Sequence, residues 1–164
     1  MTRAKNPNYK VYFRRRRDGK TNYAKRLSLV KSNATRMVIR KTNRNILIQF
    51  INFESAGDKT ILSFSSAQLK ELYGWPAKRN VYTAYLAGLY AGKQAKLKNI
   101  SDFIVDIGMH PPTKGSVLFA ALKGAVDSGL KTNLSEEKVP TDKLSKVPED
   151  LKSSFESTKK KIAG

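Results

Sequence analysis

The sequence predicts an α/β fold: a mixed sheet with an antiparallel meander and packed helices, a basic N-terminal arm and a C-terminal tail. Three observations carry this prediction. Short apolar stretches lie between closely spaced turn signals in the first half of the chain, which is typical of strands. Longer segments with apolar residues at three- and four-residue spacings follow, which is typical of helices. The 164 residues are 40% hydrophobic, enough to build a core without disulfides.

Residues 1–20 are predicted to form an arm without a core of its own. They contain the run Arg14–Arg17 and the turn signal Asp18-Gly19, but no apolar periodicity. Thr21 is a plausible cap for a short basic helix over 22–31, with Leu27 and Val30 facing inward.

Three strands are expected next, over residues 36–41, 46–53 and 60–64. The middle stretch is apolar on both faces, which predicts an interior position in the sheet. The connecting turns, at 43–45 and 56–59, are short. Short turns favour an antiparallel meander.

Two helices are expected after the meander, a short one over 65–73 that ends at Gly74 and a long one over 80–97. Gly88 and Gly92 fall on the apolar face of the long helix. Glycine weakens a helix by about 1 kcal/mol relative to alanine. We interpret the pair as a sign that this helix packs closely on the sheet.

A further strand is predicted over 102–107, then a rigid loop over 108–115 and a helix over 116–128. The order helix, strand, loop, helix indicates a crossover onto the sheet. Beyond Leu130 the composition shifts to mixed charges with two prolines, so we expect a mobile or partner-ordered tail with a helix over 149–162. The predicted organisation is an arm (1–20), a globular α/β domain (21–130) and a C-terminal extension (131–164).

The composition excludes several classes of function. Cysteine is absent, which rules out disulfides, thiolate metal sites and cysteine nucleophiles and fits a reducing cytosol. The single histidine, His110, is too few for a histidine metal cluster. The longest weakly polar run, 81–92, is shorter than the roughly 20 residues of a membrane span. We expect a cytoplasmic protein without a metal or cofactor.

The charge is the strongest functional signal. The chain has 32 Lys and Arg against 13 Asp and Glu, a net charge of +19, and residues 1–44 hold 15 of the basic residues but only one acid, Asp18. Such an excess indicates a polyanionic partner, either nucleic acid or an anionic membrane. A membrane-surface helix needs bulky apolar residues on one face. The predicted helix over 22–31 is too short and has too few, so nucleic acid is favoured.

The basic third of the chain supplies most of the candidate RNA contacts. Arginine pairs bidentately with phosphate and also stacks on bases, and neighbouring aromatic rings can stack on unpaired bases. The alternative interpretation is a solvated charge run or a localisation signal. The candidate RNA-binding residues are Arg3, Lys5, Lys10, Tyr12, Arg14, Arg15, Arg16, Arg17, Lys20, Tyr23, Lys25, Arg26, Arg36, Arg40, Arg44, Lys114 and Ser116.

Lys114 and Ser116 belong to a second candidate site, the proline-stiffened loop at 108–116. The loop leads into a helix N-terminus, where free backbone N–H groups can bind phosphate. The loop lacks the Gly-x-x-x-x-Gly-Lys-Ser/Thr pattern of a P-loop. A structural turn with a capping residue is the alternative, and His110 is then a hydrogen-bonding loop residue.

Asp102 and Asp106 are weighed as a candidate pair of catalytic acids. Four residues apart on a strand, they lie about 13 Å apart on one face. That separation is wide for a two-metal nuclease site. We interpret Asp102 as a strand-end residue and Asp106 as a partner for backbone or a lysine. A nuclease on the same fold is the alternative function, and we expect no enzymatic activity.

Three segments resemble a known family. These are YKVYFRRRRDGKTNYAKRL (9–27), YGWPAKRNVYTAYLAGLYAGKQA (73–95) and DIGMHPPTKGSVLFAALKGAVDSGL (106–130). They are similar to large-subunit ribosomal protein eighteen in its archaeal form, akin to the eukaryotic protein numbered five. The resemblance covers about residues 5–140, and the 106–130 segment is its most specific part. The tail beyond about 140 matches nothing in the family.

The resemblance implies a ribonuclease-H-like motif variant without the catalytic acids. It also implies binding of 5S rRNA and its docking onto 23S rRNA in the central protuberance of the cytoplasmic ribosome, beside the bacterial-numbered protein five. By resemblance, Arg14–Arg17, Lys20 and residues 23–26 lie in the RNA-binding N-terminal region. Residues 114–116 lie in the signature loop.

Overall fold

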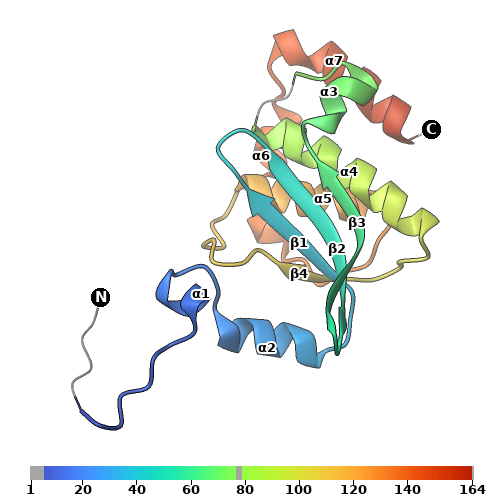
Figure 1. Ribbon diagram of the computed structural model, residues 1–164. Helices are drawn as coiled ribbons and strands as arrows, with labels where there is room; N and C mark the ends of the chain where they lie inside the picture. The colour runs from blue at the N-terminus through green and yellow to red at the C-terminus, as the bar shows by residue number, and fades with distance from the viewer. Residues whose placement is uncertain (1–5, 77–78, 164) are drawn as a thin grey trace.

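The structure, a computed structural model, describes residues 6–76 and 79–163. A four-stranded mixed sheet in the order β3-β2-β1-β4 confirms the predicted α/β class (Figure 1). The strands are β1 (Arg36–Lys41), β2 (Ile46–Glu54), β3 (Gly57–Ser65) and β4 (Ile104–Asp106). The helices are α1 (Arg14–Arg17), α2 (Tyr23–Lys31), α3 (Gln68–Tyr73), α4 (Val81–Leu97), α5 (Val117–Asp127), α6 (Thr141–Ser145) and α7 (Glu149–Ala163), with a 3₁₀ turn at Glu136–Lys138.

Strands β1, β2 and β3 form the predicted antiparallel meander, and β2 lies inside the sheet as its two apolar faces indicated. Strand β3 begins at Gly57 rather than Thr60, because the hairpin stays paired up to Glu54 opposite Gly57. Strand β4 runs parallel to β1, which confirms the crossover. It is only three residues long, since Asp102 forms an isolated bridge with Lys131 instead of joining the sheet.

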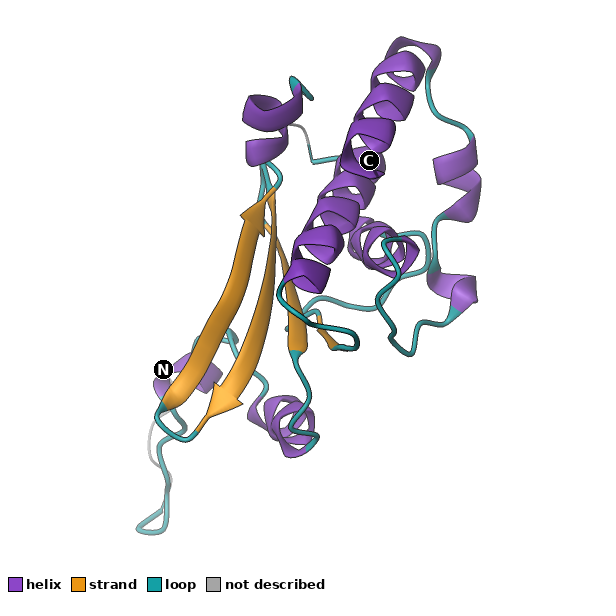
Figure 2. Cartoon of the chain, turned by 90° about the vertical axis from the view of Figure 1, so that its right-hand side faces the viewer, coloured by secondary structure: helices purple, strands orange, loops and turns teal. Residues whose placement is uncertain are grey.

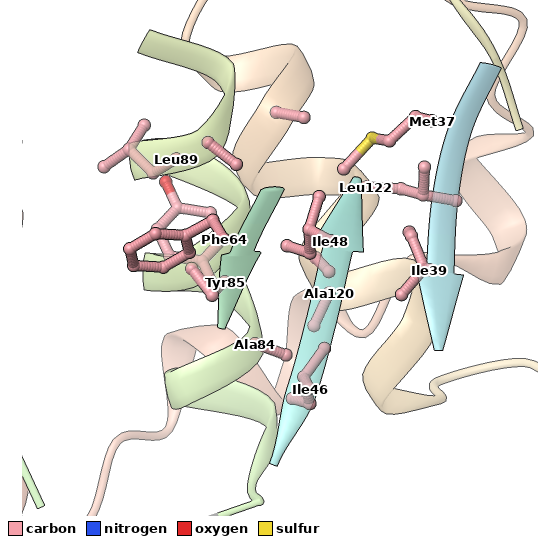
Figure 3. Close-up of a cluster of buried hydrophobic side chains, with 14 of the residues drawn as sticks. Met37, Ile39, Ile46, Ile48, Phe64, Ala84, Tyr85, Leu89, Ala120 and Leu122 are labelled. Atoms are coloured by element: carbon pink, nitrogen blue, oxygen red, sulfur yellow. The ribbon is translucent and has the colours of Figure 1, made fainter. Parts of the chain in front are cut away.

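Helices α4 and α5 cover one face of the sheet (Figure 2), and α6 and α7 pack against α4. The core lies between the sheet and this helical layer. Buried side chains of the strands point toward buried side chains of the two helices (Figure 3). The labelled members of the cluster are Met37, Ile39, Ile46, Ile48 and Phe64 from the strands and Ala84, Tyr85, Leu89, Ala120 and Leu122 from the helices.

The glycines of α4 allow a close helix–helix contact. A Cβ atom on Gly88 would overlap the carbonyl oxygen of Ala121 in α5, and one on Gly124 of α5 would overlap the carbonyl oxygen of Tyr85 in α4. The expectation that these glycines pack on the sheet is therefore wrong. Their neighbour is α5, and the absence of side chains brings the two backbones into contact.

The predicted C-terminal helix is present as α7 and packs on α4. Phe155 of α7 is buried against the rings of Trp75, Tyr82 and Tyr85. The Trp75 indole is also buried and donates to Thr83 Oγ1 at 2.9 Å. The chain itself therefore orders this part of the tail.

Candidate nucleic-acid interface

Helices α1 and α2 lie at one end of the sheet, opposite the end occupied by α3 and α7 (Figure 1). Their basic side chains are exposed to solvent, and no residue of either helix is buried. We call the exposed set Arg14, Arg15, Arg16, Arg17, Lys20, Lys25 and Arg26 the basic surface. Lys10 and Arg44 are also exposed, whereas Arg3 and Lys5 lie outside the described residues.

The N-terminus of α2 fixes the turn between the two helices. Its capping residue is Asn22, whose side-chain oxygen accepts from the Lys25 backbone N–H at 3.1 Å. The prediction of Thr21 as the cap is wrong by one residue, because the Thr21 hydroxyl instead accepts from Arg15 Nε at 2.8 Å. That bond ties α1 to the start of α2.

Helix α2 is attached to the body through charged side chains. Arg26 pairs with Asp58 of β3 at 2.7 Å, and Lys25 Nζ donates to the carbonyl oxygen of Gly108 at 3.3 Å. Leu27 does not face inward as predicted, since 56% of it is exposed. A helix with this many basic residues and no buried residue depends on this ion pair and this hydrogen bond for its position.

Asp58 and Asp106 neutralise arginines inside the fold. Arg36 is only 2% exposed, and its guanidinium lies 2.7 Å from Asp58 and 3.8 Å from Asp106. Arg40 lies 3.2 Å from the same Asp106 carboxylate, which also accepts from the Gly108 backbone N–H. The backbone partner predicted for Asp106 is present, but its cationic partners are arginines rather than a lysine.

Arg36 requires a correction to the sequence-based set of RNA contacts. Its burial leaves the guanidinium inaccessible to a ligand outside the protein, because a buried cation is held by its internal counter-ions. Arg40 remains partly exposed, with 39% of its side chain accessible. No local pattern linked Asp58 to Arg36, since the two are brought together only by the meander.

Asp58→Asn is expected to lower the free energy of unfolding by about 2 kcal/mol, because it weakens two charge-assisted contacts and leaves Arg36 less compensated. Urea unfolding of the full chain measures the effect. Glu54→Gln in the same hairpin is the matched control, because its partner Lys59 is exposed and such surface pairs contribute little. Equal effects of the two substitutions would contradict the role assigned to Asp58.

Aromatic rings lie within the basic surface. The guanidinium of Arg16 lies 4.2 Å from the centroid of the Tyr12 ring, and the rings of Phe13 and Tyr23 are 5.3 Å apart. Tyr12 and Phe13 remain 55% and 72% exposed. Exposed rings beside arginines can stack on unpaired bases, as the sequence pattern indicated.

The loop at 108–116 is partly covered by the C-terminal extension. Lys114 Nζ lies 3.3 Å from Glu137, and the Gly115 backbone N–H donates to the carbonyl oxygen of Lys138. Ser116 precedes α5, but its hydroxyl forms no capping bond. The sequence did not predict this cover, because nothing in the local pattern relates the loop to residues 137–138.

His110 lies beside Lys41 and Arg40. Partial burial, followed by repulsion from these two cations, lowers the pKa of the imidazole below its ordinary value of 6.5. The side chain is therefore predominantly neutral at pH 7 and adds little to the positive surface. A lowered pKa in the folded state also means that protonation at acidic pH favours the unfolded chain.

The acids of this region are not arranged for metal chemistry. Across residues 6–76 and 79–163, no group of three or more His, Asp or Glu side chains could hold a metal ion. Asp102 is exposed and accepts from the Ser101 hydroxyl, and Asp106 is engaged by arginines. Within the same described residues, no helix combines the length and apolar character that crossing a membrane requires.

Comparison with known proteins identifies the family. The family model described as "Ribosomal large subunit proteins 60S L5, and 50S L18" matches residues 7–103, more than half of the chain. The chain belongs to this family. The large ribosomal subunit protein uL18 of the archaeon Korarchaeum cryptofilum is 49% identical over 140 residues, which cover 85% of this chain and 71% of the relative.

Membership of the L18 family makes the chain a structural constituent of the large ribosomal subunit, of the archaeal type. Family membership also implies a location on the ribosome in the cytoplasm and an association with RNA. The matched residues include both helices of the basic surface and all three strands of the meander. The resemblance found in the sequence is thereby confirmed at the level of the family.

Proposed function

We propose that the chain binds 5S rRNA through the basic surface and helps to dock it onto 23S rRNA, beside the bacterial-numbered protein five. The observation that carries the proposal is the exposed basic surface on two short helices at one end of the sheet. Seven cations are exposed there, while the nearby carboxylates of Asp58 and Asp106 are engaged by arginines. The arrangement favours a polyanion of defined shape.

The proposed contacts follow from exposure. The basic surface supplies phosphate contacts, and Tyr12 and Tyr23 supply aromatic faces. Further proposed contacts are Lys10, Arg40, Arg44 and Lys114, and, from the sequence alone, Arg3 and Lys5. Ser116 is removed from the set, because its hydroxyl oxygen is buried. Arg36 is reassigned from RNA contact to holding Asp58 in place for Arg26.

We further propose that the chain has no catalytic activity beside this structural role. The engagement of the Asp106 carboxylate by Arg40, Arg36 and the Gly108 N–H supports this, because a metal-dependent nuclease needs free carboxylates to bind its metal ions. Nothing in the described residues favours the alternative of an RNA-processing nuclease.

A binding titration tests the proposed function. The full chain is titrated against 5S rRNA and against an unrelated RNA of equal length, at 50 and 200 mM salt. We expect a preference for 5S rRNA that persists at the higher salt, because shape recognition is screened less than simple charge attraction. Equal binding to both RNAs, lost together as salt rises, would contradict the 5S assignment.

A further inference from the structure

Two adjoining hollows lie at the junction of α1, α2 and the loop after β4. The first, which we call the phosphate hollow, has a volume of about 100 Å³. It is lined by cationic side chains from α1, α2, β1 and the turn between the two helices: Arg15, Lys20, Lys25, Arg26 and Arg40. The second, which we call the base hollow, has a volume of about 270 Å³. Thr21, Asn22 and Met109 line both, so the hollows share a wall.

The hollows differ in chemistry. The base hollow is lined by Tyr23, Ala24, Met109 and Arg16. An aromatic ring, a thioether and a guanidinium together suit the flat, polarisable face of a nucleobase. The phosphate hollow suits an anion, because its one carboxylate, Asp106, is already engaged by Arg40 and the Gly108 N–H.

The volumes of the two hollows also suit the groups assigned to them. The phosphate hollow, at about 100 Å³, is several times the minimum volume for one water molecule and has room for a phosphate group. The base hollow, at about 270 Å³, is larger and has room for a nucleobase. In a nucleotide, one sugar connects the base to the phosphate. The two hollows share a wall, so they adjoin as the two parts of one nucleotide do.

We propose that the two hollows together bind one unstacked nucleotide of an RNA strand, with the base against Tyr23 and Met109 and a flanking phosphate among the cations. The inference rests on the proposed function and deepens it: the rRNA site must present an unpaired nucleotide at this point. Met109, more than half exposed on a loop, thereby acquires a role that neither charge nor the sequence pattern indicated.

The test fills the base hollow without changing any charge. Ala24 is exposed on α2 and lines the base hollow, so Ala24→Phe obstructs it. Ser28→Phe is the matched control, because Ser28 is exposed on the same helix and lines neither hollow. Affinities of the full chain and both variants are measured against 5S rRNA and 23S rRNA in parallel, after circular dichroism has verified folding.

We expect Ala24→Phe to weaken binding by about 5- to 150-fold, the range measured for loss of one stacked base, with no change in salt dependence. Ser28→Phe should stay within about twofold of the wild type. RNAs that lack a single base are then compared at successive unpaired positions. At one position, removal of the base should weaken binding to the wild type. The same removal should cause no further loss with Ala24→Phe, because the base and the hollow act as one contact.

Three outcomes would overturn the inference: Ala24→Phe binding like the wild type, Ser28→Phe weakening binding equally, or displacement of the RNA by micromolar free adenosine monophosphate, which indicates a small-molecule site. Met109→Ala removes a side chain that lines both hollows and repeats the test from a loop if Ala24→Phe does not fold. If the wild type shows no preference for 5S rRNA, that result contradicts the proposed function but not the inference about the hollows. The comparison on 23S rRNA then still decides whether the hollow binds a nucleotide.

Discussion

Deletion of residues 1–20 is expected to remove most of the RNA affinity while leaving the body folded. The segment holds eight of the 32 basic residues and one acid. Of its described part, residues 6–20, no side chain is buried, so the core does not depend on it. If each of the eight cations neutralises one phosphate, raising the salt from 50 to 200 mM should weaken binding of the deletion variant less than that of the full chain. The two losses should differ by a factor of about 10³, using the slope for single strands.

Binding titrations at the two salt concentrations measure this effect, and thermal unfolding checks the body. A sharper variant replaces Arg14–Arg17 by glutamine. Its matched control replaces Lys152, Lys159, Lys160 and Lys161, four exposed lysines of α7. An equal loss of affinity in both quadruple variants would mean that total charge, and not the basic surface, governs binding. Unchanged affinity after the deletion would contradict the arm's role outright.

Gly88→Ala is expected to destabilise the fold by about 3 kcal/mol, although it improves the intrinsic helix propensity by about 1 kcal/mol. The new Cβ would overlap the Ala121 carbonyl oxygen, which belongs to the backbone of α5 and cannot rotate away. For a chain of this size the loss corresponds to a melting temperature lower by about 6–12 °C. Thermal and urea unfolding of the full chain measure it.

Gly92→Ala in the same helix is the control. Its Cβ chiefly meets the hydroxyl group of Ser128, a side chain that can change rotamer. We therefore expect a smaller loss of stability than at Gly88. The gain in helix propensity is the same at both positions, so the difference reflects how easily each overlap is relieved. A Gly88→Ala variant more stable than the wild type would mean that the two helices separate without cost.

The elements with strong local patterns were predictable from the sequence. Strand β2 and helix α4 were expected almost to the residue, because their apolar periodicity is a local signal. The cap of α2 was misplaced by one position, since threonine and asparagine are both good capping residues and only the Arg15 bond distinguishes them.

The features that could not be predicted are non-local. The packing partner of Gly88 depends on where the crossover places α5, and a glycine has no side chain to indicate it. The burial of Arg36 depends on its ion pair with Asp58. Arg36 lies in β1 and Asp58 in β3, which is two positions away in the sheet. The basic surface could be predicted from the composition. The two hollows could not, because they form only where α1, α2 and the loop at Met109 come together.

The packing of α7 gives the protein a built-in optical reporter. Trp75 is the only tryptophan of the chain, is 1% exposed and lies against Phe155 of α7. Its fluorescence therefore senses whether the C-terminal helix is docked, while the arm at the other end of the sheet contains no indole to obscure the signal. Docking of the C-terminal helix can thus be followed in the unlabelled protein by tryptophan emission, separately from the RNA affinity of the arm.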